Sequence, residues 1–97
     1  MTYEDQGHYV GELGPDNIRE GRGIYRYFNG DVYFGGWHDE KFHGLGSYVF
    51  ESGETFEGNL FQGSKEGIGK YYYTNGTYYS GGWLNDLKHG YGTYEVP

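Results

Sequence analysis

Large aromatic residues and glycines alternate along this chain with a period that fits extended strands. Between Gly21 and Trp37, rings and glycines occupy every second position on either side of an Asn-Gly pair. Alternate residues of a strand point to the same face of a sheet, so the pattern predicts a β-hairpin with one face of rings and glycines. The stretch is too rich in glycine for a helix and too aromatic for a flexible linker.

The hairpin pattern returns at a fixed spacing. Gly-x-Gly begins at residues 21, 44, 67 and 90, and the aromatic positions, the turn and a closing Trp or Leu follow in register. A fixed period of this length is the signature of a repeat protein. We therefore interpret residues 1–97 as a single array, with a divergent unit at 1–20, full units at 21–43, 44–66 and 67–89, and a half unit at 90–97.

Strand parity predicts the turn inside each hairpin. If Tyr25 and Tyr33 face the same way, an odd number of residues must separate the two strands. A two-residue type I′ turn, which Asn-Gly often forms, would place the second set of rings on the other face. We therefore predict a three-residue loop, a type I turn closed by a left-handed glycine at Gly30, Gly53 and Gly76.

The repeating face is expected to be structural, because rings can lie over the bare backbone of glycines on neighbouring strands. A glycine alone weakens a strand, and a ring laid over it compensates. The opposite face varies from unit to unit, as at Arg22, Leu45, Ile68 and Tyr91. The predicted structural glycines are Gly23, Gly30, Gly35, Gly46, Gly53, Gly58, Gly69, Gly76 and Gly81.

The unit G-x-G-x-Y-x-[YF]-x-[NS]-G-x-x-[YF]-x-G-x-[WL] resembles the MORN repeat (membrane occupation and recognition nexus) over almost the whole chain. The resemblance implies an all-β fold, an elongated, twisted, single-layer antiparallel sheet of stacked hairpins with an aromatic-lined groove. Nine strands would make a rod of roughly 40 Å at about 4.8 Å per strand. The second full unit departs from the others, with Phe56 and Leu60 where they carry Tyr and Trp.

The composition indicates a folded chain built on rings. Only 35% of the residues are apolar, but 22% are aromatic, and each ring can bury a large area. The net charge of −7, with no cluster of basic residues, argues against nucleic acid and anionic lipid as partners. Without cysteine there is no disulfide framework, and without a long apolar run we expect a soluble, cytoplasmic protein.

Catalytic, metal and cofactor chemistry finds little support in the sequence. A Gly-x-Gly nucleotide site needs a third glycine and a following helix, and neither is present. His43 and His89 hold equivalent positions two repeats apart, so a loop role is expected for them instead of metal ligation. The carboxylates Glu54 and Glu57 do not recur as a pair and indicate solvated surface charge. We therefore predict no catalytic residue, no metal, no cofactor and no enzyme activity.

The aromatic stripe is the candidate binding site. Most of its rings are expected to pack on one another, but a single layer has no second layer to cover them all. Tyrosine and tryptophan edges are favoured at protein interfaces, so the reachable rings predict a groove for a partner. The predicted groove residues are Tyr25, Tyr27, Tyr33, Trp37, Tyr48, Phe50, Phe56, Tyr71, Tyr73, Tyr79 and Trp83.

The leading functional hypothesis is a non-catalytic scaffold whose groove binds a helix or an extended segment of a partner protein. The resemblance implies a cytoskeletal, ciliary or cell-cortex assembly. The alternative is a peripheral membrane module that binds phosphoinositides, which the missing basic cluster disfavours. A third hypothesis is an array that organises an enzyme on another chain. The last strand, residues 90–97, has an open edge that invites a partner strand or a second copy.

Overall fold

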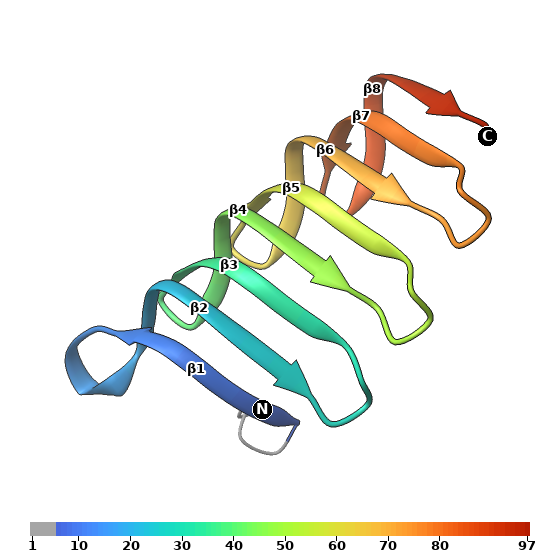
Figure 1. The fold of residues 1–97 in the computed structure, drawn as a ribbon. Coiled ribbons are helices and arrows are strands. Elements are labelled where there is room, and N and C mark those ends of the chain that lie inside the picture. Colours follow the sequence, from blue (N-terminus) through green and yellow to red (C-terminus); the bar gives the residue numbers. More distant parts are fainter. Residues whose placement is uncertain (1–5) are drawn as a thin grey trace.

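One antiparallel sheet makes up the described part of the chain. The computed structural model describes residues 6–97, and in that range eight strands lie in sequence order, each paired with its chain neighbours (Figure 1). A short 3-10 helix, η2 (Pro15–Asn17), joins the first two strands. The strands are β1 (Gly7–Leu13), β2 (Arg19–Tyr27), β3 (Val32–His38), β4 (Lys41–Val49), β5 (Thr55–Phe61), β6 (Ser64–Tyr72), β7 (Tyr78–Leu84) and β8 (Leu87–Glu95).

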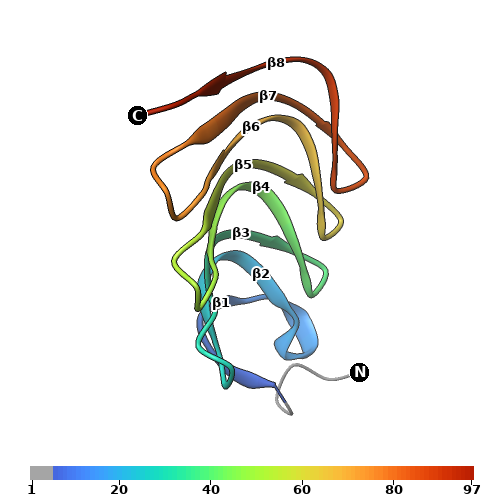
Figure 2. The same ribbon diagram turned by 90° about the vertical axis from the view of Figure 1, so that its right-hand side faces the viewer.

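The sheet is a single layer, as the resemblance to the MORN repeat implies. Within residues 6–97 no second sheet covers either face, and the strands arch over one another along the length of the molecule (Figures 1 and 2). The molecule measures 44 × 25 × 20 Å. Its long dimension agrees with the rod of roughly 40 Å expected from about 4.8 Å per strand. The ninth predicted strand would begin on residues 1–5, which lie outside the described residues.

The three-residue loops predicted from strand parity are present. The backbone N–H of Tyr27 donates to the carbonyl oxygen of Asp31, and the N–H of Gly30 donates back to Tyr27, so three residues separate the strands. Gly30 has a φ of 102°, in the region that favours glycine. The same bonds and positive φ recur at Gly53 and Gly76.

The rings cover glycines of the following strand. Glycine pairs with glycine both between β2 and β3 and between β3 and β4, and the ring of Tyr33 in β3 lies over Gly46 in β4. The ring of Phe56 in β5 lies over Gly69 in β6 in the same way. Each covering ring therefore joins one repeat to the next, in addition to the backbone hydrogen bonds.

The strands bend at bulges in which the first glycine of each Gly-x-Gly motif has a positive φ. The β3–β4 register shifts just after Gly35, and equivalent shifts occur in the β5–β6 and β7–β8 pairs. Gly44 lies beside the first of these bulges with a φ of 80°, and Gly21, Gly67 and Gly90 share this conformation. Bulges bend a strand and increase its twist. The sheet accordingly curves, as Figure 2 shows, and its aromatic face is called the trough below.

The two equivalent histidines lie at the bulges. His43 is part of β4 and His89 part of β8, and their carbonyl oxygens occupy the space above Gly36 and Gly82. The prediction of a loop role for these histidines was wrong. The turn lies earlier in the chain, at residues 39–40, and the strand has already begun where the histidine stands.

Candidate functional site: an aromatic trough

The floor of the trough is a continuous aromatic core. Trp37 lies edge-on to Tyr9 and Tyr33, with ring centroids 5.2 and 5.4 Å apart, and Trp83 lies edge-on to Phe56 at 5.4 Å. Edge-to-face packing is a favourable arrangement of aromatic rings. Within residues 6–97, the buried apolar side chains form one cluster, consisting of Tyr25, Tyr33, Trp37, Phe56, Leu60, Tyr79 and Trp83.

The eleven predicted groove residues separate into two groups. Six belong to the buried cluster, so their side chains hold the sheet together and offer little surface to a partner. The other five are half-buried and keep part of the ring accessible. These five, called the ring ladder below, are Tyr27, Tyr48, Phe50, Tyr71 and Tyr73.

Two hydroxyl groups of the ring ladder donate hydrogen bonds to carboxylates of the same chain. The hydroxyl of Tyr48 donates to Oδ2 of Asp31 at 2.8 Å, and that of Tyr71 donates to Oε1 of Glu54 at 2.7 Å. Burial and then these carboxylate hydrogen bonds raise the pKa of both tyrosines well above the usual value. The trough therefore presents ring faces and edges at these two positions.

We expect the sheet to lose stability as the pH rises above about 10. Tyrosine in an unfolded chain has a pKa near 10, whereas burial holds the pKa of Tyr33, Tyr48 and Tyr71 higher in the folded protein. Below that pH both states keep the proton. Above it the unfolded state releases protons that the folded state retains, so unfolding becomes easier.

A single alkaline titration followed by tyrosinate absorbance and far-UV circular dichroism checks this expectation. The last tyrosines should ionise together with the loss of the sheet signal. Ionisation of every tyrosine with an unchanged sheet spectrum would contradict it.

A basic side chain lies over a buried tryptophan in two units of the trough. The guanidinium carbon of Arg19 is 5.8 Å from the ring centroid of Trp37, and Nζ of Lys65 is 5.6 Å from that of Trp83. Both distances are within the range of cation–π attraction. Because each charge lies over a buried indole and is paired with an acid, it is not part of an exposed basic cluster.

The acids paired with these charges lie in two-residue turns. Glu40 and Asp86 have φ angles of 70° and 68°, where a residue other than glycine costs about 1 kcal/mol. Glu40 accepts hydrogen bonds from the backbone N–H and the guanidinium of Arg19, at 2.7 and 3.1 Å. Asp86 accepts from the backbone N–H of Lys65 at 2.8 Å. These bonds between neighbouring repeats offset the backbone strain.

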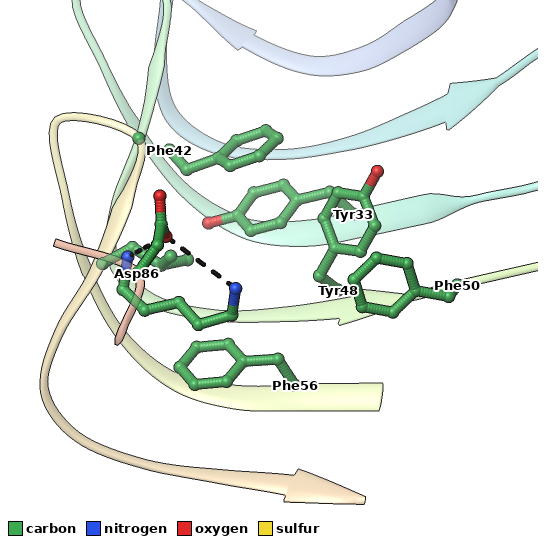
Figure 3. A pocket seen from close by; sticks show the side chains of 9 residues that line it. Tyr33, Phe42, Tyr48, Phe50, Phe56 and Asp86 are labelled. Atoms are coloured by element: carbon green, nitrogen blue, oxygen red, sulfur yellow. Dashed lines mark hydrogen bonds and ion pairs between the residues drawn. The ribbon is translucent and has the colours of Figure 1, made fainter. Parts of the chain in front are cut away.

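The middle unit differs at all three of these positions and contains a cavity. Leu60 replaces the tryptophan, Phe42 replaces the basic residue, and Gly63 replaces the acid of the turn. A cavity of about 210 Å³ opens beside Leu60 (Figure 3). It is lined by Tyr33, Phe42, Tyr48, Phe50, Phe56, Leu60, Gly63, Lys65 and Asp86.

Sequence reasoning missed part of this lining. Phe42, Lys65 and Asp86 fall at positions that do not repeat as one residue type, so the repeat pattern carries no signal for them. Leu60 is visible in the sequence as a departure, but its consequence depends on the rings around it. Among residues 6–97, no three His, Asp or Glu side chains are placed to hold a metal ion. In the same range, no helix is long and apolar enough to cross a membrane.

The fold and the trough define a class of protein, a repeat-built interaction module. The MORN repeat matches the chain at residues 16–32, 33–55, 56–78 and 79–95. The chain therefore belongs to the MORN-repeat family, whose repeats mediate protein or membrane interactions.

One curated relative shares part of the array. A stretch of 42 residues is 43% identical to a protein of Plasmodium berghei (strain Anka) described as "Inactive protein tyrosine kinase pTKL". The match covers 43% of this chain and 3% of that protein. The similarity is therefore limited to a short stretch of a much longer protein.

Proposed function

We propose that this protein is a non-catalytic scaffold whose trough binds a helix or an extended segment of a partner protein. The observation that carries the proposal is the ring ladder. Its five rings follow one another with centroid distances of 5.8, 4.7, 6.1 and 5.0 Å. Four of them also pack against the buried cluster, which fixes their position. Rigid aromatic rings are favoured anchors in interfaces because little side-chain entropy is lost on binding.

The length of the ring ladder sets the size of the partner segment. The ladder runs from β2 to β6, four strand spacings, or about 19 Å at about 4.8 Å each. A helix of about thirteen residues or an extended segment of about six covers that distance. We further propose, on the family resemblance, that the protein is a cytoplasmic subunit of a cytoskeletal or ciliary assembly.

Loss of either of two ladder rings is expected to weaken partner binding at least about tenfold while the sheet stays folded. Phe50→Ala and Tyr73→Ala remove half-buried rings, whereas Ile68→Ala, 66% exposed on the opposite face, is the matched control. A photo-crosslinking residue at position 50 or 68 first identifies the partner and the face in native extract. Direct binding of that partner to the three variants is then measured.

Two outcomes would contradict the scaffold proposal. One is unchanged binding by folded Phe50→Ala and Tyr73→Ala proteins. The other is robust co-sedimentation with phosphoinositide vesicles at physiological salt, which would favour the membrane alternative despite the net charge of −7.

Pairing along the outer edge of β8 is a second way to hold a partner. Every residue of β8 is exposed, and within residues 6–97 only β7 lies beside it. An extended segment or a second copy would add a strand there through backbone hydrogen bonds. This edge pairing stays a prediction.

A further inference from the structure

We infer that the cavity beside Leu60 receives a tryptophan side chain of the partner. The inference rests on the scaffold proposal and names the chemistry of the group that anchors in the trough. The reason lies in the repeat itself, because the two flanking units show what fills this place. Trp37 and Trp83 stand at the positions equivalent to Leu60.

The two native tryptophans define the shape and polarity of the site. Trp83 lies edge-on to Phe56 and Tyr79, with both centroid distances at 5.4 Å. Its indole N–H donates to the carbonyl oxygen of Gly69 at 3.2 Å. Trp37 makes the equivalent hydrogen bond in its own unit, also at 3.2 Å. An indole in this place is thus held between two rings and by one hydrogen bond.

Two rings also flank the equivalent place in the middle unit, which has no indole. One repeat earlier, the two flanking rings are Tyr33 and Phe56, and both line the cavity (Figure 3). The carbonyl oxygen of Gly46 is equivalent to that of Gly69, which accepts the hydrogen bond of Trp83. Leu60 has no N–H in its side chain to donate to it. The cavity of about 210 Å³ exceeds the roughly 150 Å³ that suffices for benzene in a protein interior. A bicyclic indole therefore fits the cavity in size, and by analogy with Trp83 we assign the Gly46 carbonyl as the acceptor of its N–H.

The turn that closes the flanking units is altered in the middle one. The carboxylate of Glu40 accepts hydrogen bonds from Arg19 in β2, whereas Gly63 at the equivalent turn position has no side chain. Phe42 stacks on Tyr33 with centroids 3.9 Å apart, where the other units place a charged group. The Phe42 side of the cavity is therefore apolar, whereas the ion pair of Lys65 and Asp86 also lines it.

A capped amino acid tests the site without knowledge of the partner. N-acetyl-tryptophanamide is titrated into the isotope-labelled protein, and backbone amide shifts are mapped by NMR. We expect saturable shifts around Phe42, Gly46 and Leu60. N-acetyl-phenylalaninamide should bind about fivefold more weakly, because it lacks the hydrogen-bond donor. The absence of saturable binding, shifts confined to other regions, or equal binding of N-acetyl-leucinamide would overturn the inference.

Filling the cavity from within should abolish the binding. Leu60→Trp places this chain's own indole in the site and is expected to weaken the capped tryptophan at least about tenfold. Leu45→Trp adds the same side chain at a 69% exposed position on the opposite face and should leave binding unchanged. If Leu60→Trp alters the circular dichroism spectrum, Leu60→Phe is the smaller filling variant. Full binding by a folded Leu60→Trp protein would overturn the inference.

The scaffold proposal and the tryptophan site can fail separately. If Phe50→Ala and Tyr73→Ala abolish partner binding while folded Leu60→Trp binds the partner normally, the trough is correct and the tryptophan anchor is wrong. If the capped tryptophan binds beside Leu60 but the ladder variants keep full partner affinity, the cavity is a tryptophan site and the scaffold proposal is wrong.

Discussion

Replacement of Trp83 by alanine is expected to lower the free energy of unfolding by about 3–5 kcal/mol. The side chain is only 6% exposed, and its indole N–H bonds to the carbonyl oxygen of Gly69. The truncation leaves a cavity between Phe56 and Tyr79, which no second layer can collapse to fill. A domain has only about 5–15 kcal/mol of stability, so this single change removes a large share.

Denaturant unfolding, with hydrogen exchange as the local measurement, checks the expected loss. Each repeat contacts only its neighbours, so protection should fall first in β6–β8 and least in β1–β3. Tyr91→Ala is the matched control, because that side chain is 99% exposed and its loss should change stability by no more than about 0.5 kcal/mol. A loss below about 1 kcal/mol for Trp83→Ala would show that the indole is not part of the core.

This expectation changes which substitutions can test binding. From the sequence, Trp37 and Trp83 are among the first groove residues to replace. In the structure both are buried, so replacing them reports on folding before it reports on a partner. Binding is tested on the ring ladder, where Phe50 and Tyr73 are half-buried and lie outside the buried cluster.

Strand parity was sufficient to predict the hairpin loops, because it depends only on counting residues. With Tyr25 opposite Tyr33, the loop length is odd and a glycine such as Gly30 must close it. The turn at Asp39 and Glu40 was not predicted. Both residues have positive φ, which an Asp-Glu pair does not signal. The positive φ angles are explained by a contact with another repeat, because the Glu40 carboxylate accepts hydrogen bonds from Arg19.

The cavity was out of reach of sequence reasoning for a different reason. Leu60 is apolar like the tryptophans of the other units, so the replacement leaves the pattern of apolar and polar positions unchanged. Its effect depends on the rings on either side, Tyr33 and Phe56, and on the missing side chain at Gly63. These residues come from different strands and a turn, and only the register brings them together.

Gly69→Ala is expected to cost about 1–3 kcal/mol, although alanine is normally the better residue in a strand. A Cβ at this position would lie 2.7 Å from two ring carbons of Phe56 and 3.3 Å from the carbonyl oxygen of Glu57. The backbone of Gly69 is not left-handed, so the cost arises from the ring above it.

A double-mutant cycle with Phe56→Leu isolates this contact. The smaller side chain leaves room for the added methyl group. The double variant should therefore lose less stability than the two single losses added together, by about 1 kcal/mol or more. Denaturant midpoints of the four proteins give the coupling directly. Additive losses would mean that the ring does not rest on the glycine. Coupling would show that successive repeats are joined by ring-on-glycine contacts, which also place Tyr33 over Gly46 at the wall of the cavity.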